Sequence, residues 1–207
     1  MKTNIIGFML FLSVFLFYSC GGKTVKENET FGKMPSLVAN YVKTDSIHKT
    51  QAEQEAKNLK VGDLKNYLEK FKKEEEEAEA KLKSEAKLEI AKLKDKAVPF
   101  SVENENFEIK NLKISDEEIS NGKTVKLPFT FTVKKPITLP DFSNGYTLKY
   151  KLIDKDGNVI EKDKELTLIL AENYNTKVVE PGKEVTQNIY LSLKNPAMAN
   201  FKEIIFY

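Results

Sequence analysis

Residues 90–103, which read IAKLKDKAVPFSVE, decide the fold of this chain. Before Val98 the apolar residues recur every three or four positions, which is the spacing of one face of a helix. After Pro99 they alternate with polar residues, which is the spacing of a strand, and Pro99 itself makes continuation of a helix unfavourable. We therefore expect an α+β chain in which a helical region, residues 36–97, precedes an all-β region, residues 98–207.

The stronger helical pattern lies in residues 64–97, which contain neither Gly nor Pro. Oppositely charged residues four positions apart, such as Glu69 and Lys73, support such a helix by ~0.3 kcal/mol each. The helix would be roughly 50 Å long, but its middle offers only alanine to a partner. Three alternatives remain open: a solvated stalk, a helical hairpin in which residues 36–61 fold back on the long helix, or a coiled coil that forms a homo-oligomer.

Single residues predict where helices begin and end between residues 36 and 63. Ser36 is placed to cap the first helix, and residues 44–46 (Thr-Asp-Ser) are placed to interrupt it and cap a second one. Gly62 and Asp63 predict a further break before the long helix.

The all-β region predicts about seven strands separated by turn residues. We expect them at residues 100–103, 107–114, 124–133, 146–153, 159–169, 185–193 and 202–207. Alternation such as that of Leu148, Tyr150 and Leu152 with lysines gives each strand one buried face. This number and spacing of strands predict an immunoglobulin-like β-sandwich.

The N-terminus has the features of an export signal. Residues 1–19 comprise Lys2, an apolar run at residues 5–17 and the small residue Ser19, and Cys20 follows directly. An uncleaved membrane anchor is the alternative, because the apolar run is near the lower limit for spanning a bilayer. Residues 20–35 are mostly polar, and we expect them to form a flexible tether.

The leader resembles the signals of bacterial lipoproteins, with Ser19 at the small position and Cys20 as the acceptor. The resemblance implies that the Cys20 thiol takes a diacylglyceryl group, that the chain is cut before it, and that the new amine is acylated, for instance by palmitate. The resemblance thus implies that the chain binds the membrane through the lipid attached to Cys20. Gly21 in place of Asp favours the outer membrane, on its periplasmic or surface face, and the Lys-rich, Arg-free composition resembles that of Bacteroidetes lipoproteins.

Composition excludes several classes of function. The chain has 33 basic residues, all of them Lys, against 31 acidic residues, so its net charge of +2 and its lack of Arg argue against nucleic-acid binding. One Cys excludes an intramolecular disulfide and a Cys-based zinc site, and one His excludes a His-pair metal site. We expect no cofactor and no bound metal.

Two acidic stretches look at first like cation sites. Asp154, Asp156, Asn158 and Glu165 have part of the spacing of a calcium loop, but Gly157 is the fourth residue where such a loop needs Gly sixth. A hairpin turn explains these residues better. We interpret residues 116–118 (Asp-Glu-Glu) as a solvated loop and His48 as a surface residue.

Aromatic side chains in the loop at residues 136–146 are the best candidates for binding. Phe142 and Tyr146 would form a platform for a glycan or a peptide, or would anchor the loop to the core. Paired carboxylates could still make a glycosidase-like site without His or Cys. Their spacing singles out no such pair, and we expect no enzyme activity and no catalytic residue.

Residues 106–207 resemble the small immunoglobulin-like domains of bacterial envelope lipoproteins, including those of the FxLYD type. The resemblance lies in residues 150–154 (YKLID), the turn at residues 156–159 (DGNV) and residues 179–184 (VEPGKE), which lead into a late strand. It implies an extracytoplasmic interaction module without a catalytic centre. We therefore expect a non-enzymatic envelope lipoprotein whose helical spacer presents a sandwich to an envelope protein or a glycan.

Overall fold

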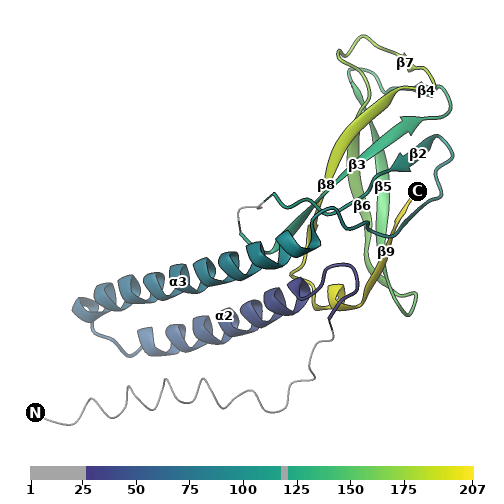
Figure 1. Ribbon diagram of the computed structural model, residues 1–207. Helices are drawn as coiled ribbons and strands as arrows, with labels where there is room; N and C mark the ends of the chain where they lie inside the picture. Colours follow the sequence, from purple (N-terminus) through teal and green to yellow (C-terminus); the bar gives the residue numbers. More distant parts are fainter. Residues whose placement is uncertain (1–26, 118–120) are drawn as a thin grey trace, which may run out of the picture.

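The computed structural model describes residues 27–117 and 121–207, and in these ranges it contains two helices followed by nine strands (Figure 1). The α+β class with the helices first is thus confirmed. The expected signal peptide, Cys20 and Glu118 lie outside the described residues.

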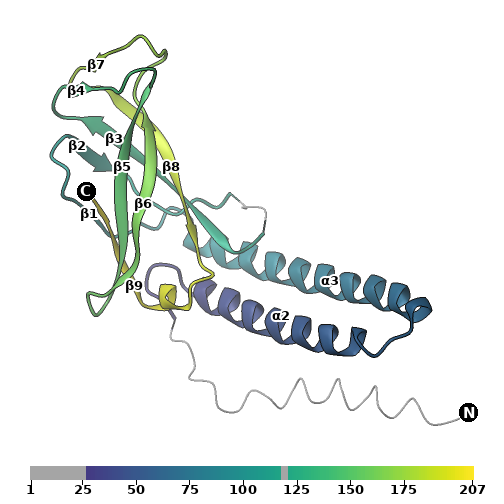
Figure 2. The same cartoon turned by 180° about the vertical axis from the view of Figure 1, so that it is seen from behind.

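The two helices form a hairpin. Helix α2 (Met34–Ala56) and helix α3 (Val61–Leu93) lie side by side in both views (Figures 1 and 2), joined by a turn at residues 57–60. The His48 ring packs on Phe71 with centroids 4.6 Å apart, and the Lys49 ammonium lies 3.3 Å from the Glu75 carboxylate. Of the three alternatives, the fold therefore adopts the hairpin rather than a single stalk.

Several expected helix boundaries were wrong. Ser36 is not a cap, because α2 already begins at Met34 with Pro35 in its first turn, a position that Pro favours. Residues 44–46 do not interrupt α2, because the Thr44 hydroxyl donates to the Asn40 carbonyl at 2.9 Å within the helix.

Helix α3 is also shifted toward the N-terminus relative to expectation. It starts at Val61, so Gly62 and Asp63 lie in its first turn rather than in a break. It ends at Leu93 because Asp95 adopts φ +61° and its backbone N–H donates to the Ile114 carbonyl instead of to the helix.

The strands form three sheets. The four-stranded sheet has the order β1 (Phe100–Val102), β9 (Phe201–Phe206), β5 (Gly145–Asp154) and β6 (Val159–Ile169). The three-stranded sheet has the order β2 (Phe107–Lys110), β3 (Thr124–Val133) and β8 (Glu184–Ser192), and β4 (Ile137–Thr138) pairs with β7 (Val178–Val179). Only the β1–β9 pair among them is parallel. The seven expected strands are present, and the expected number was too low because β4 and β7 are too short to show alternation.

The two larger sheets share one apolar core. Phe129 of β3 lies 6.2 Å from Phe206 of β9 between ring centroids, and Phe107 of β2 lies 5.1 Å from Tyr146 of β5. Every second residue of β3 is buried in this core, which stabilises the fold by about 1.5–3 kcal/mol for each large side chain. Residues at the C-terminal end of α3, among them Ala86 and Ile90, join the same core. The base of the hairpin and the sheets therefore pack as one body.

Candidate functional site

Residues 28–34, which we call the N-terminal latch, are bound to the β region. Asn28 is only 5% exposed, and its side-chain amide donates to the carbonyls of Met198, Ala199 and Phe201 at 3.4, 3.2 and 3.2 Å. The expectation that residues 20–35 form a flexible tether is therefore wrong from Asn28 onward. Residues 20–26 lie outside the described part of the chain.

The latch also folds on itself. The Asn28 side-chain oxygen accepts from the backbone N–H groups of Thr30 and Phe31 at 2.8 and 2.7 Å. The backbones of Asn28 and Gly32 exchange two hydrogen bonds, which Gly32 permits by adopting φ +54°. Phe31 is fully buried and packs on Phe201 with centroids 4.9 Å apart. The chain is thus held in place before α2 begins.

The position of the latch determines where the N-terminus can be anchored. It contacts the 3₁₀ helix η1 (Pro196–Asn200) and the start of β9, at the end of the β region from which the hairpin projects (Figures 1 and 2). Cys20 precedes Asn28 by eight residues, which span at most about 28 Å. The latch itself lies against the β region, at the base of the hairpin.

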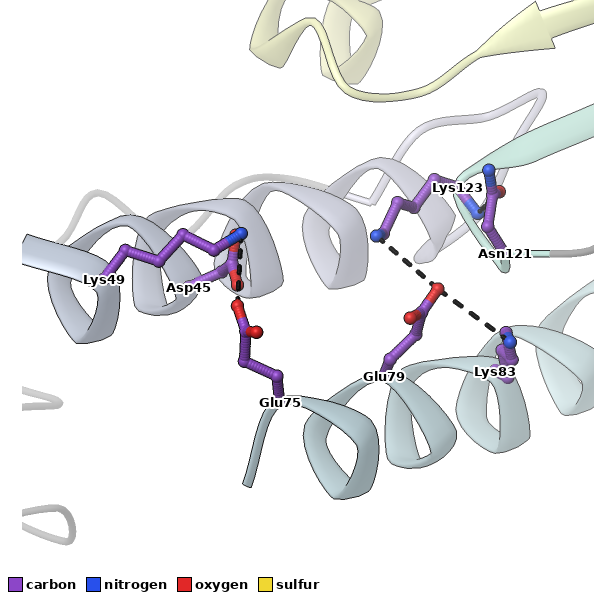
Figure 3. Close-up of polar contacts among 7 residues, drawn as sticks. All are labelled: Asp45, Lys49, Glu75, Glu79, Lys83, Asn121 and Lys123. Carbon is purple, nitrogen blue, oxygen red and sulfur yellow. Dashed lines mark hydrogen bonds and ion pairs between the residues drawn. The ribbon is translucent and has the colours of Figure 1, made fainter. Parts of the chain in front are cut away.

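Polar contacts fasten the hairpin to the β region (Figure 3). The Lys123 ammonium, just before β3, lies 3.9 Å from Glu79 of α3 and 4.4 Å from the centroid of the Tyr41 ring of α2. Burial, assisted by nearby carboxylates including Glu79, raises the pKa of Tyr41. Gly122 lets the segment before β3 lie close to α3. A Cβ at this position would lie only 3.3 Å from the Cβ of Ala86.

Further along the hairpin, charged side chains join the two helices to each other. The Lys49 ammonium contacts Asp45 at 3.0 Å as well as Glu75 (Figure 3), and these hydrogen bonds raise the pKa of Lys49. His48, expected to be a surface residue, is partly exposed and lies 3.2 Å from Glu74. Exposed pairs of this kind contribute at most about 1 kcal/mol each to the stability of the hairpin.

The acidic stretches form turns and ion pairs. Asp154 accepts from the backbone N–H groups of Asp156 and Asn158 at 2.9 and 2.8 Å, and the Asn158 side chain donates to it at 3.1 Å. The hydrogen bonds, that of the Asn158 side chain foremost, lower the pKa of Asp154. The turn joins β5 to β6, so the hairpin-turn interpretation is confirmed. In residues 27–117 and 121–207, no group of three or more His, Cys, Asp or Glu residues is arranged to hold a metal ion.

Asp116 and Glu117, the last residues of the first described range, each pair with a lysine. Asp116 pairs with Lys94 at 2.8 Å, and this hydrogen bond lowers the pKa of Asp116. Glu117 pairs with Lys126.

The two aromatic residues of the expected platform lie in different environments. Phe142 is 91% exposed and adopts φ +58°, whereas Tyr146 is partly buried against Phe107. Tyr146 therefore anchors the loop, and Phe142 is left as the exposed aromatic. Tyr174, which the sequence did not single out, is also exposed in the loop between β6 and β7.

An open groove of about 440 Å³ lies along residues 170–183, beside β7. Its walls include Glu172 and Glu180, and both are exposed. The groove is thus an open surface feature with acidic side chains on its walls.

Within the described ranges, no helix combines the length and the apolar character needed to cross a membrane.

Comparison of the chain with protein-family models, with curated proteins and with solved structures finds no match.

Proposed function

We propose that this protein is a non-enzymatic lipoprotein of the bacterial cell envelope, anchored through acylated Cys20. One observation carries the proposal: an export-type leader ends on the only Cys of the chain, eight residues before a buried latch. Acyl chains on Cys20 would hold the protein to the membrane, because each buried methylene contributes ~0.8 kcal/mol. Gly21 after the Cys supports an outer-membrane location.

The β region would be the interaction module. We propose that it is an immunoglobulin-like β-sandwich of the envelope type, which is supported by the shared core of its two larger sheets and by contacts such as that of Phe129 with Phe206. The latch would keep the β region close to the lipid, with β4 and β7 at the end remote from the latch (Figure 1). The hairpin would be a side arm, and the protein would act by positioning these surfaces for an envelope partner.

Cell fractionation tests the anchor. We expect the wild-type chain in the membrane fraction and the Cys20→Ala variant in the soluble fraction, because the variant lacks the thiol that accepts lipid. Ser19→Ala keeps a small residue before the cut and is the matched control, expected to stay in the membrane. Retention of Cys20→Ala in the membrane without acylation would overturn the proposal.

A second candidate function is glycan or peptide binding through the loop at residues 136–146. The observation that favours it is the 91% exposure of Phe142, since large aromatic residues on exposed loops are suited to contact a ligand. On a glycan or peptide array, Phe142→Ala should abolish binding, whereas Tyr190→Ala, which truncates an exposed Tyr of β8, should not. Equal binding by the wild type and Phe142→Ala would exclude this function for the loop.

A further inference from the structure

We propose that the tip of the helical hairpin is a contact surface for an anionic lipid bilayer. The hairpin tip comprises residues 57–68, which form the turn after α2 and the first turns of α3. The proposal rests on the lipid anchor proposed above and adds a second, reversible membrane contact to it.

Apolar side chains at the tip face solvent on one side of α3. Val61 is 88% exposed, Leu68 is also exposed and Leu64 is partly exposed. At roughly 100° per residue, these three side chains fall within about 60° of one another around the helix axis. Leu59 in the adjoining turn is also exposed. Covering this stripe with another apolar surface would remove its side chains from water, which is favourable.

The tip also carries lysines. Residues 57–68 contain three Lys and one acidic residue, whereas residues 74–79 contain five Glu. Lys57 and Lys60 are exposed and form no ion pair within the described ranges. Helices that lie in a membrane interface combine an apolar face with flanking Lys, and Lys near an anionic surface strengthens the binding. The charge and the apolar stripe therefore suit the same occupant, an anionic lipid surface.

A second copy of the chain fits this surface less well. The exposed Leu88 lies twenty residues after Leu68, which places the two roughly 160° apart around α3. The exposed apolar residues thus do not continue as the single stripe that a coiled coil needs.

The chain lengths allow the tip to reach the membrane. The latch lies within about 28 Å of Cys20, and α2 extends roughly 35 Å from the latch to the tip. A hairpin tilted toward the lipid would bring Val61 to the headgroups. The acyl anchor and the tip would then contact the membrane at two separated points and fix the orientation of the β region.

Single-tryptophan reporters test the proposal directly, because the chain contains no Trp. The full acylated chain carrying Val61→Trp, Leu88→Trp or Phe142→Trp is reconstituted on vesicles of phosphatidylglycerol or phosphatidylcholine, with and without brominated acyl chains. The Leu88→Trp and Phe142→Trp chains are the matched controls, since they replace exposed apolar residues away from the tip. We expect quenching of at least about twofold for Val61→Trp on the anionic vesicles and little quenching for the two controls.

A charge-reversal variant tests the role of the lysines. Adding Lys57→Glu and Lys60→Glu to the Val61→Trp chain should reduce its quenching at least about twofold on phosphatidylglycerol vesicles.

Each other outcome overturns a defined claim. Failure of the chain to float with vesicles contradicts the lipid anchor, and hence the proposed function. Flotation without quenching of the Val61→Trp reporter overturns the tip contact alone, as does equal quenching of all three reporters. A blue shift of the Val61→Trp emission that depends on protein concentration without vesicles would assign the tip to self-association instead.

Discussion

Asn28 of the latch offers the most informative single perturbation. Its amide joins the N-terminal segment to three carbonyls at η1 and β9, and its oxygen accepts from two backbone N–H groups. Asn28→Ala removes both sets of hydrogen bonds at a site that is almost fully buried. We expect the latch to loosen and Phe31 to lose part of its packing against Phe201.

The magnitude follows from the groups left without partners. The N–H groups of Thr30 and Phe31 are involved in buried hydrogen bonds, and each buried donor without a partner costs about 1–3 kcal/mol. Partial relaxation of the segment reduces the sum, so we expect a loss of about 3 kcal/mol in the free energy of unfolding. With a urea m-value of about 2–3 kcal/mol/M for a chain of this size, the midpoint should fall by about 1–1.5 M.

Urea unfolding followed by circular dichroism, in the Cys20→Ala background, measures this shift. Asn58→Ala is the matched control, because Asn58 is exposed and its side-chain amide donates, among the described residues, only to the Gln54 carbonyl. We expect it to change stability by less than about 0.5 kcal/mol. If Asn28→Ala changed stability no more than Asn58→Ala, the latch would not hold the N-terminal segment.

Three further predictions concern the joint, the hairpin and the β5–β6 turn. Gly122→Ala should cost about 1–2 kcal/mol in urea unfolding, because Gly122 adopts φ +63° and its new Cβ would crowd Ala86 and the Lys83 backbone; a loss below that of Gly157→Ala, which has a similar φ and no neighbour within 4 Å, would contradict this. Gly62→Ala should raise the free energy of unfolding, measured by thermal melting, by about 0.5–1 kcal/mol, since Gly62 is helical and the new Cβ would meet nothing within 4 Å. A lower free energy of unfolding would refute the helical assignment at this position. The lowered pKa of Asp154 makes its carboxylate stabilising above the unfolded-state value of about 3.9, and this contribution is lost as pH falls through the lower folded-state pKa. Melting temperatures from pH 6 to pH 2 should therefore fall less steeply for Asp154→Asn than for the wild type, and parallel curves would contradict the assignment.

Elements whose pattern is local were predictable from the sequence. The alternation in residues 124–133 matches β3 in its bounds, because β3 keeps one face in the core. Strand β6 also has the expected bounds, although Leu168 is its only buried residue. Strands β4 and β7 have two residues each and carry no periodic signal. The break expected at residues 44–46 is absent because hydroxyl groups can also donate to a carbonyl within a helix, as that of Thr44 does.

The latch could not be predicted, because its contacts are distant in sequence. Residues 28–34 look polar apart from two large apolar side chains, and the Asn28 partners lie about 170 residues further along the chain. The sequence does not decide between a stalk, a hairpin and a coiled coil for a similar reason: pairs such as His48 with Glu74 have no signature within either helix. The exposure of Phe142 and the partial burial of Tyr146 against Phe107 of another strand likewise have no signature in the local sequence.

The most direct test of the lipid anchor is the intact mass of the protein isolated from its native membrane. The account predicts a mature chain that begins at Cys20 and carries a diacylglyceryl group with a further acyl chain on the new amine. A chain that begins at Met1, or one that begins at Cys20 without lipid, would contradict it.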